Sequence, residues 1–114
     1  SGNLLNADYT DEVIATGGGS PSVIGFIGNG SSSEEVAALR AKVGESQMIW
    51  TPGVNLAVGD GDMGQRYGHP KGAVLAGSDA IIVGSGIHGA DSRQEAAAEY
   101  ARESFEALCE REGQ

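Results

Sequence analysis

Three short apolar runs constrain the fold of this chain more than any other feature of its sequence. They occupy residues 22–28, 47–51 and 79–83, and they are rich in β-branched side chains. Runs of this length and composition are typical of strands buried on both faces of a parallel sheet. A helical pattern precedes the first run and another follows each of the three. This alternation predicts an α/β fold built around a parallel sheet.

The helical patterns are located by the residues at their ends. They are predicted at residues 9–15, 34–43, 70–75 and 92–112. Ser32 or Ser33 suits the N-cap of the second helix, and Pro70 suits the first turn of the third. Ser92 and Glu95 form a capping box for the last helix. That helix also carries an apolar stripe that we expect to face the core, formed by Ala97, Tyr100 or Ala101, Phe105 and Leu108.

Three strands make an incomplete parallel sheet, because both faces and both edges of such a sheet need to be covered. The 114 residues suit one small domain, residues 1–114. We therefore expect a fragment of a larger fold, or a subunit that pairs with another chain.

The charge and cysteine content exclude several classes of partner. Seven basic and 16 acidic residues give a net charge of −9, which argues against nucleic acid and against an anionic membrane surface. The single cysteine, Cys109, excludes an internal disulfide and indicates a reducing, cytoplasmic location. No apolar run approaches the roughly 20 residues that span a bilayer.

Ligands of parallel α/β folds bind where the strands end, so three segments are candidates for a site. They are residues 28–30, residues 51–54 with the long loop that follows, and residues 84–86. Gly84, Ser85 and Gly86 form the best phosphate candidate, because glycines let backbone N–H groups approach an anion. The alternative is an ordinary glycine-rich turn at the end of a strand.

The loop at residues 59–67 has three interpretations. Its alternating aspartates suggest a calcium loop, but the bidentate glutamate that such loops need is missing. Gln65, Arg66 and Tyr67 can instead donate hydrogen bonds to phosphate oxygens. A solvated polar loop is the third interpretation. His69 and His88 have no neighbouring ligands at a metal-binding spacing, and no nucleophile–base constellation is present, so neither a metal site nor catalytic residues are predicted.

Several segments, taken in order, resemble the orotidine 5'-phosphate decarboxylase family of its eukaryotic type. Residues 4–10 resemble the loop and helix after the family's fifth barrel strand, and residues 23–27 resemble its sixth strand. Thr51-Pro52-Gly53-Val54 resembles the end of the seventh strand, and Gly64-Gln65-Arg66-Tyr67 resembles the Gly-Gln-Gln-Tyr of the phosphate lid. Residues 78–87 resemble the eighth strand with its Gly-Arg-Gly loop, and residues 100–108 resemble the final helix.

The resemblance implies the C-terminal half of a TIM (β/α)8 barrel that binds orotidylate or uridylate without a cofactor or metal. It implies that Pro52 lies against the pyrimidine and that Gln65 and Tyr67 contact the phosphate. It also implies that Gly84 and Gly86 donate backbone hydrogen bonds to that phosphate, beneath a lid formed by residues 54–67.

Two departures from the family pattern change what the resemblance implies. The family's catalytic lysine and aspartate network lies on the N-terminal half of the barrel, and Lys42 and Lys71 match neither catalytic position. Ser85 stands where the family has a phosphate-binding arginine, a loss that Arg66 would partly offset.

Two hypotheses follow. The chain is the phosphate- and pyrimidine-binding half of a decarboxylase and needs an N-terminal half-barrel chain to be active. Alternatively, it is a diverged or engineered half-barrel that forms homo-oligomers and binds nucleotide weakly or not at all.

Overall fold

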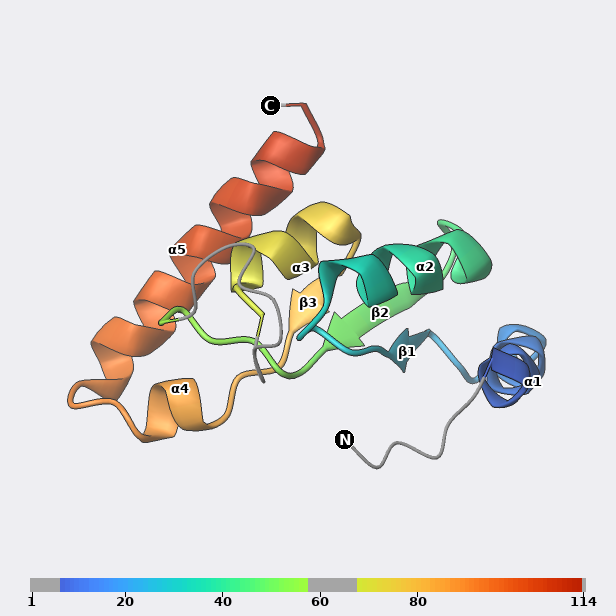
Figure 1. Cartoon of the computed structure of the whole chain (residues 1–114), viewed down its shortest axis with the longest axis horizontal. Helices are drawn as coiled ribbons and strands as arrows, with labels where there is room; N and C mark the ends of the chain where they lie inside the picture. Colours follow the sequence, from blue (N-terminus) through green and yellow to red (C-terminus); the bar gives the residue numbers. More distant parts are fainter. Residues whose placement is uncertain (1–6, 58–67, 114) are drawn as a thin grey trace.

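The computed structural model describes residues 7–57 and 68–113 of the chain. Helices and short strands alternate along it, as predicted (Figure 1). The elements are α1 (Ala7–Gly18), β1 (Gly25–Ile27), α2 (Ser33–Val43), β2 (Met48–Thr51), α3 (Pro70–Ala76), β3 (Ala80–Ile81), α4 (Ser85–His88) and α5 (Arg93–Arg111). The short helix α4 was not predicted, and it occupies the segment expected to be an open loop. None of the helices in the described ranges is long and apolar enough to cross a membrane.

The three strands form one parallel sheet in the order β1-β2-β3, which confirms the predicted arrangement. Phe26 pairs with Ile49, and Trp50 lies between Ile27 on one side and Ala80 on the other. The strands are shorter than the apolar runs that predicted them: β1 covers three of residues 22–28, and β3 covers two of residues 79–83. Parallel pairing places all three C-terminal strand ends at the same edge of the sheet.

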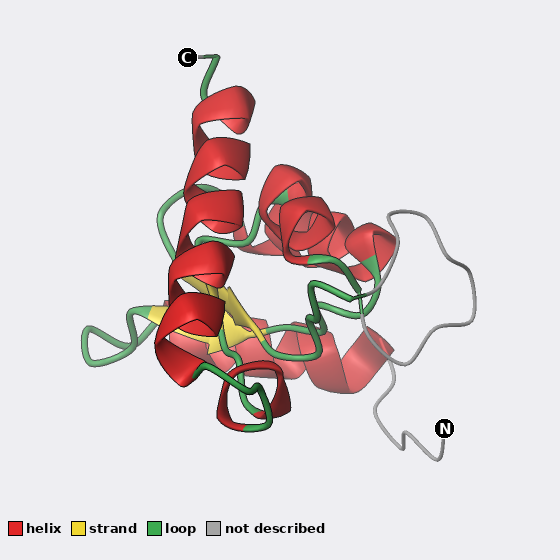
Figure 2. Cartoon of the chain, turned by 90° about the vertical axis from the view of Figure 1, so that its left-hand side faces the viewer, coloured by secondary structure: helices red, strands yellow, loops and turns green. Residues whose placement is uncertain are grey.

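Helices cover one face of this sheet. Figures 1 and 2 both place α2 and α3 on the same side of the strands, and α3 packs between α2 and α5. Ile49 and Thr51 point toward these helices and are fully buried. Val36 of α2 and Ala73 and Val74 of α3 complete this part of the core.

The other face of the sheet remains exposed, although the apolar runs predicted burial on both faces. Side chains alternate along β2, so Met48 and Trp50 point away from the helices, and Trp50 is 39% exposed. Its neighbour in β1, Ile27, is 65% exposed. We call the surface formed by Ile27, Met48 and Trp50 the open face.

The stripe predicted for α5 is wrong except at Tyr100. Tyr100 and Ala107 are buried, whereas Phe105 is 57% exposed and Leu108 is also exposed. Tyr100 and the small residue Ala107 lie on the buried side of the helix, whereas the bulky side chains of Phe105 and Leu108 lie on its exposed side. Phe105 and Leu108 therefore form a second apolar surface on the chain.

Side-chain caps define several of the helix ends. Ser32 and Ser92 accept hydrogen bonds from the N–H groups of Glu35 and Glu95, at 3.2 and 3.3 Å, as predicted. His69 caps α3, because its Nδ1 accepts from the N–H of Lys71 at 3.1 Å. This bond gives His69 a structural role that its position in a glycine-rich loop did not suggest.

A cluster of charged side chains ties the helices to the N-terminal edge of the sheet. Asp79 accepts a hydrogen bond from the backbone N–H of Ile49 at 2.9 Å and forms an ion pair with Arg40 of α2. Arg40 also donates to the carbonyl of Gly77, with its Nε at 3.1 Å. Arg111 of α5 lies 3.6 Å from the other oxygen of Asp79 and donates to two carbonyls near β3. We call Asp79, Arg40 and Arg111 the aspartate clamp.

Candidate functional site

The loops after β1 and β2 are joined by a direct backbone contact at the C-terminal edge of the sheet. The N–H of Gly30 donates to the carbonyl of Pro52 at 2.9 Å. A Cβ at residue 30 would lie 2.5 Å from that carbonyl oxygen, so the approach requires a glycine. Pro52, the residue expected to contact a pyrimidine, is half-buried and held by this contact.

The ends of the long loop after β2 lie side by side. Gly68 donates to the carbonyl of Gly53 at 2.9 Å, and its own carbonyl accepts from Asn55 at 2.8 Å. Val54 and Gly68 form a parallel bridge between the two ends. The loop is therefore closed at its base, next to Pro52. Gln65, Arg66 and Tyr67, the phosphate contacts expected from the sequence, lie outside the described residues.

Gly84, Ser85 and Gly86 form the beginning of α4 rather than an extended loop. The carbonyl of Gly84 accepts hydrogen bonds from the N–H groups of Ile87 and His88, at 3.0 and 3.1 Å. Those two donors are therefore already used. The N–H groups of Ser85 and Gly86 belong to the first turn of a helix, where no acceptor is available within the helix. Two backbone donors thus remain at the position expected to hold a phosphate.

The two glycines at the start of α4 differ in what an added side chain would contact. A Cβ at Gly86 would overlap the hydroxyl of Tyr100 and lie 2.9 Å from its Cζ, so packing against α5 requires a glycine there. A Cβ at Gly84 would meet only Nε2 of His88, at 3.9 Å, so no described neighbour needs that space. Neither glycine has a positive φ. The open space therefore lies at Gly84, and Ser85 beside it is exposed.

Tyr100 is the site residue that sequence reasoning missed, because it was taken only as a member of an apolar stripe. Its hydroxyl accepts a hydrogen bond from the backbone N–H of Leu56 at 3.1 Å, across 44 positions of the chain. A buried tyrosine usually finds a polar partner, so the sequence indicated that a partner exists without identifying it.

The described site segments carry no acidic, basic or nucleophilic pair suited to bond cleavage. Lys42 lies 2.8 Å from Asp11 and Lys71 lies 3.6 Å from Glu110, so both lysines form ion pairs on helices. Within residues 7–57 and 68–113, no three His, Cys, Asp or Glu side chains gather to hold a metal ion. Backbone N–H groups without an acceptor can bind an anion, and the half-buried Pro52 lies at the same edge of the sheet.

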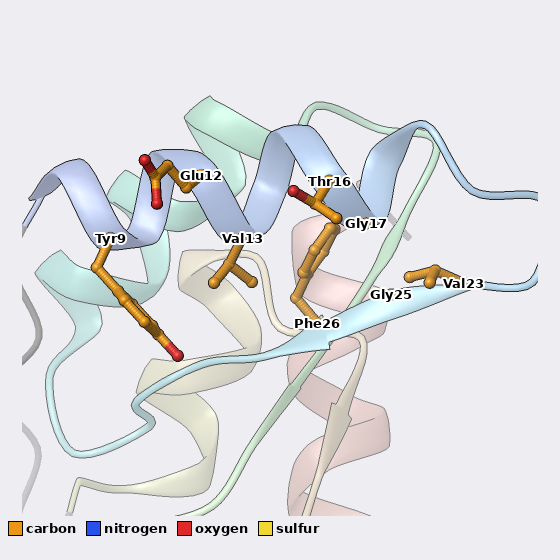
Figure 3. A pocket seen from close by; sticks show the side chains of 8 residues that line it. All are labelled: Tyr9, Glu12, Val13, Thr16, Gly17, Val23, Gly25 and Phe26. Atoms are coloured by element: carbon orange, nitrogen blue, oxygen red, sulfur yellow. The ribbon is translucent and has the colours of Figure 1, made fainter.

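A separate cavity of about 470 Å³ opens between α1 and β1, away from the strand ends. Val13 points from α1 toward β1, Phe26 points from β1 toward Gly17 of α1, and Tyr9 borders the cavity (Figure 3). This cavity adjoins the edge of β1 that pairs with no strand in the described part of the chain.

Comparison with known proteins gives one consistent result. The sequence model of the "Orotidine 5'-phosphate decarboxylase / HUMPS family" matches residues 2–100. The orotidine 5'-phosphate decarboxylases of Passalora fulva and Penicillium chrysogenum are 34% and 36% identical to the chain over 98% of its length. The chain spans 41% and 40% of these two relatives.

Solved structures give the same fold. The orotidine 5'-phosphate decarboxylase of Pyrococcus horikoshii OT3 aligns with a TM-score of 0.62 and 30% identity, over 83% of this chain and 41% of that one. The enzyme from Lactobacillus acidophilus aligns with a TM-score of 0.61 and 25% identity, over 90% and 40% of the two chains. Three parallel strands that alternate with helices thus fit part of an α/β barrel.

Proposed function

Because the chain belongs to the orotidine 5'-phosphate decarboxylase / HUMPS family, we propose that residues 1–114 form one domain, the phosphate- and pyrimidine-binding half of an orotidine 5'-phosphate decarboxylase. The complete enzyme would convert orotidylate to uridylate and carbon dioxide. The observation that carries the proposal is that the loops after β1 and β2 are joined at one edge of the sheet, and that Tyr100 links the second of them to the start of α4.

The proposed contacts with the nucleotide are made by residues at the C-terminal edge of the sheet. Pro52 forms the wall against the pyrimidine, and the free N–H groups at the start of α4 face the phosphate. Gln65, Arg66 and Tyr67 are proposed as further phosphate contacts on the strength of the family motif alone. Binding energy from a phosphate distant from the reacting bond helps drive such a reaction.

Catalysis requires a second half-barrel, because the described site residues include no lysine and the chain spans about 40% of its relatives. Three surfaces support such a partner: the free edge of β1 beside the 470 Å³ cavity, the open face, and the exposed side of α5. In a complete barrel, inward side chains of alternate strands fill the interior in layers. Trp50 and Ile27 on the open face are suited to that packing.

The direct test mixes the chain with an N-terminal half-barrel from a fungal relative and follows the conversion of orotidylate to uridylate. We expect activity from the mixture and none from either half alone. Titration of the chain with uridylate, in a separate experiment, reports binding without catalysis. A mixture that associates but stays at background would refute the catalytic part of the proposal and leave the binding part standing.

A second candidate function is a non-catalytic half-barrel that pairs with its own copy. The observation that favours it is Ser85, an exposed, uncharged side chain where the family has an arginine. Sedimentation of the chain alone distinguishes the two candidates. A stable homodimer that an N-terminal half-barrel does not displace supports the second one, and a monomer that binds the half-barrel supports the first.

Replacing Ser85 with arginine is expected to strengthen uridylate binding about 10- to 150-fold, since a hydrogen bond to a charged group contributes about 1.5–3 kcal/mol. Calorimetric titration measures the change. Ser46→Arg is the matched control, because Ser46 is exposed and precedes β2, at the opposite edge of the sheet. An equal gain from both variants would attribute the effect to net charge rather than to a site at α4, and uridine, which lacks the phosphate, should gain nothing.

A further inference from the structure

The side chain of Tyr100 lies between the two loops that the nucleotide would touch, although it comes from α5 and belongs to neither loop. It is only 4% exposed. Its hydroxyl receives the N–H of Leu56 at 3.1 Å, and Leu56 lies at the base of the long loop after β2. One side chain of the last helix thus reaches the segment that carries Pro52.

The same hydroxyl lies against the beginning of α4. No Cβ can be accommodated at Gly86, because it would overlap the hydroxyl and lie 3.2 Å from Cε2 of the ring. The backbone of Gly86 is therefore in direct contact with Tyr100, and α4 packs on α5. The contact between α4 and α5 can therefore be changed in two ways: by adding a side chain at residue 86, or by removing the hydroxyl of Tyr100.

The hydrogen bonds of residues 55–57 show how this segment is held in place. Asn55 bonds to Gly68, and Ala57 bonds to the side chain of Asn55, so both bonds stay within the loop. In the described ranges, the bond from Leu56 to Tyr100 is the one that joins this segment to the C-terminal helices. Tyr100 thus links the base of the loop to the start of α4.

We propose that Tyr100 is a positioning residue of the nucleotide site, which holds the base of the β2 loop and the start of α4 at the spacing that a nucleoside monophosphate requires. This role rests on the proposed function, because it takes α4 as the phosphate position. Tyr100 does not touch the nucleotide. It sets the separation between the pyrimidine wall at Pro52 and the phosphate donors at Ser85 and Gly86.

The test is Tyr100→Phe, which keeps the ring and removes the hydroxyl. Titration with uridylate is expected to show about three- to tenfold weaker binding, the equivalent of one neutral hydrogen bond. Titration with uridine is expected to change much less, because uridine has no phosphate to span the two loops. The same comparison is repeated in chains that also carry Ser85→Arg, because their higher affinity for uridylate is easier to measure.

Tyr9→Phe is the matched control, since it removes a tyrosine hydroxyl on α1, a helix that packs on α2 and β1. It should leave both affinities unchanged. Amide hydrogen exchange gives a readout that needs no ligand: the N–H of Leu56 should lose protection in Tyr100→Phe and keep it in Tyr9→Phe.

The outcomes separate the inference from the proposed function. Equal uridylate binding by Tyr100→Phe and the unchanged chain overturns the positioning role and leaves the site in place. A parallel loss for uridylate and uridine, with a lowered melting temperature, makes Tyr100 a structural residue only and also overturns it. If neither the chain nor Ser85→Arg binds uridylate, the proposed function fails, and the positioning role fails with it.

Discussion

Replacing Asp79 with alanine is expected to lower the free energy of unfolding by about 2–4 kcal/mol. Asp79 is the centre of the aspartate clamp, where it accepts from the N–H of Ile49 and balances the charges of Arg40 and Arg111. Without it, the mostly buried guanidinium of Arg40 loses its ion-pair partner, Arg111 keeps only its pair with Glu112 at 3.4 Å, and a backbone donor in β2 loses its acceptor. Thermal or urea unfolding followed by circular dichroism measures the loss.

Asp11→Ala is the matched control, because Asp11 also forms an ion pair, with Lys42 at 2.8 Å. Those two side chains are 60% and 41% exposed, and exposed pairs contribute about 0–1 kcal/mol. Similar losses from the two variants would show that the clamp contributes no more than a surface ion pair. A small domain has about 5 kcal/mol or more of stability, so Asp79→Ala should stay mostly folded while its unfolding midpoint falls clearly.

The second large effect is expected at the open face, where Trp50→Glu should weaken association with an N-terminal half-barrel by about 100-fold or more. A tryptophan that fills an interface is often worth more than 2 kcal/mol, and the replacement also buries a carboxylate in apolar surroundings. The chain's own fold should persist, because Trp50 points away from the helices and is partly exposed already. Calorimetric titration between the halves measures the association.

Ala41→Glu adds the same charge to an exposed position of α2 and should leave the association unchanged. If Trp50→Glu unfolds the chain, measured by circular dichroism before mixing, the open face contributes to the stability of the chain itself. Undiminished association with a folded Trp50→Glu chain would place the partner elsewhere, at the edge of β1 or on α5.

The order of elements was predictable because local chemistry decides it. Apolar β-branched runs formed the strands, and serine caps at Ser32 and Ser92 formed the helix starts, all within a few residues of chain. The family was predictable as well, because its motifs retain their order and spacing. The placement of the three strand ends at one edge followed from parallel pairing alone.

The errors arose where the outcome depends on distant parts of the chain. The stripe on α5 was misplaced because burial depends on what lies opposite the helix: Tyr100 and Ala107 are buried, whereas Phe105 and Leu108 are exposed. The helix α4 was missed because Gly84, Ser85 and Gly86 have low helix propensity. The partners of Tyr100 and Asp79 lie 44 and 30 positions away, and no spacing rule reaches that far.

If the chain is the proposed half-barrel, the shortness of its edge strands determines how it can be exchanged between relatives. β1 has three residues and β3 has two, so their free edges offer few backbone groups to a neighbouring strand. Backbone pairing is indifferent to sequence, whereas packing against Trp50 and Ile27 is not. Chimaeras with N-terminal halves of other species should therefore succeed or fail by the match of their inward side chains. Because the edge strands are short, they also offer few unpaired backbone groups for aggregation through strand pairing.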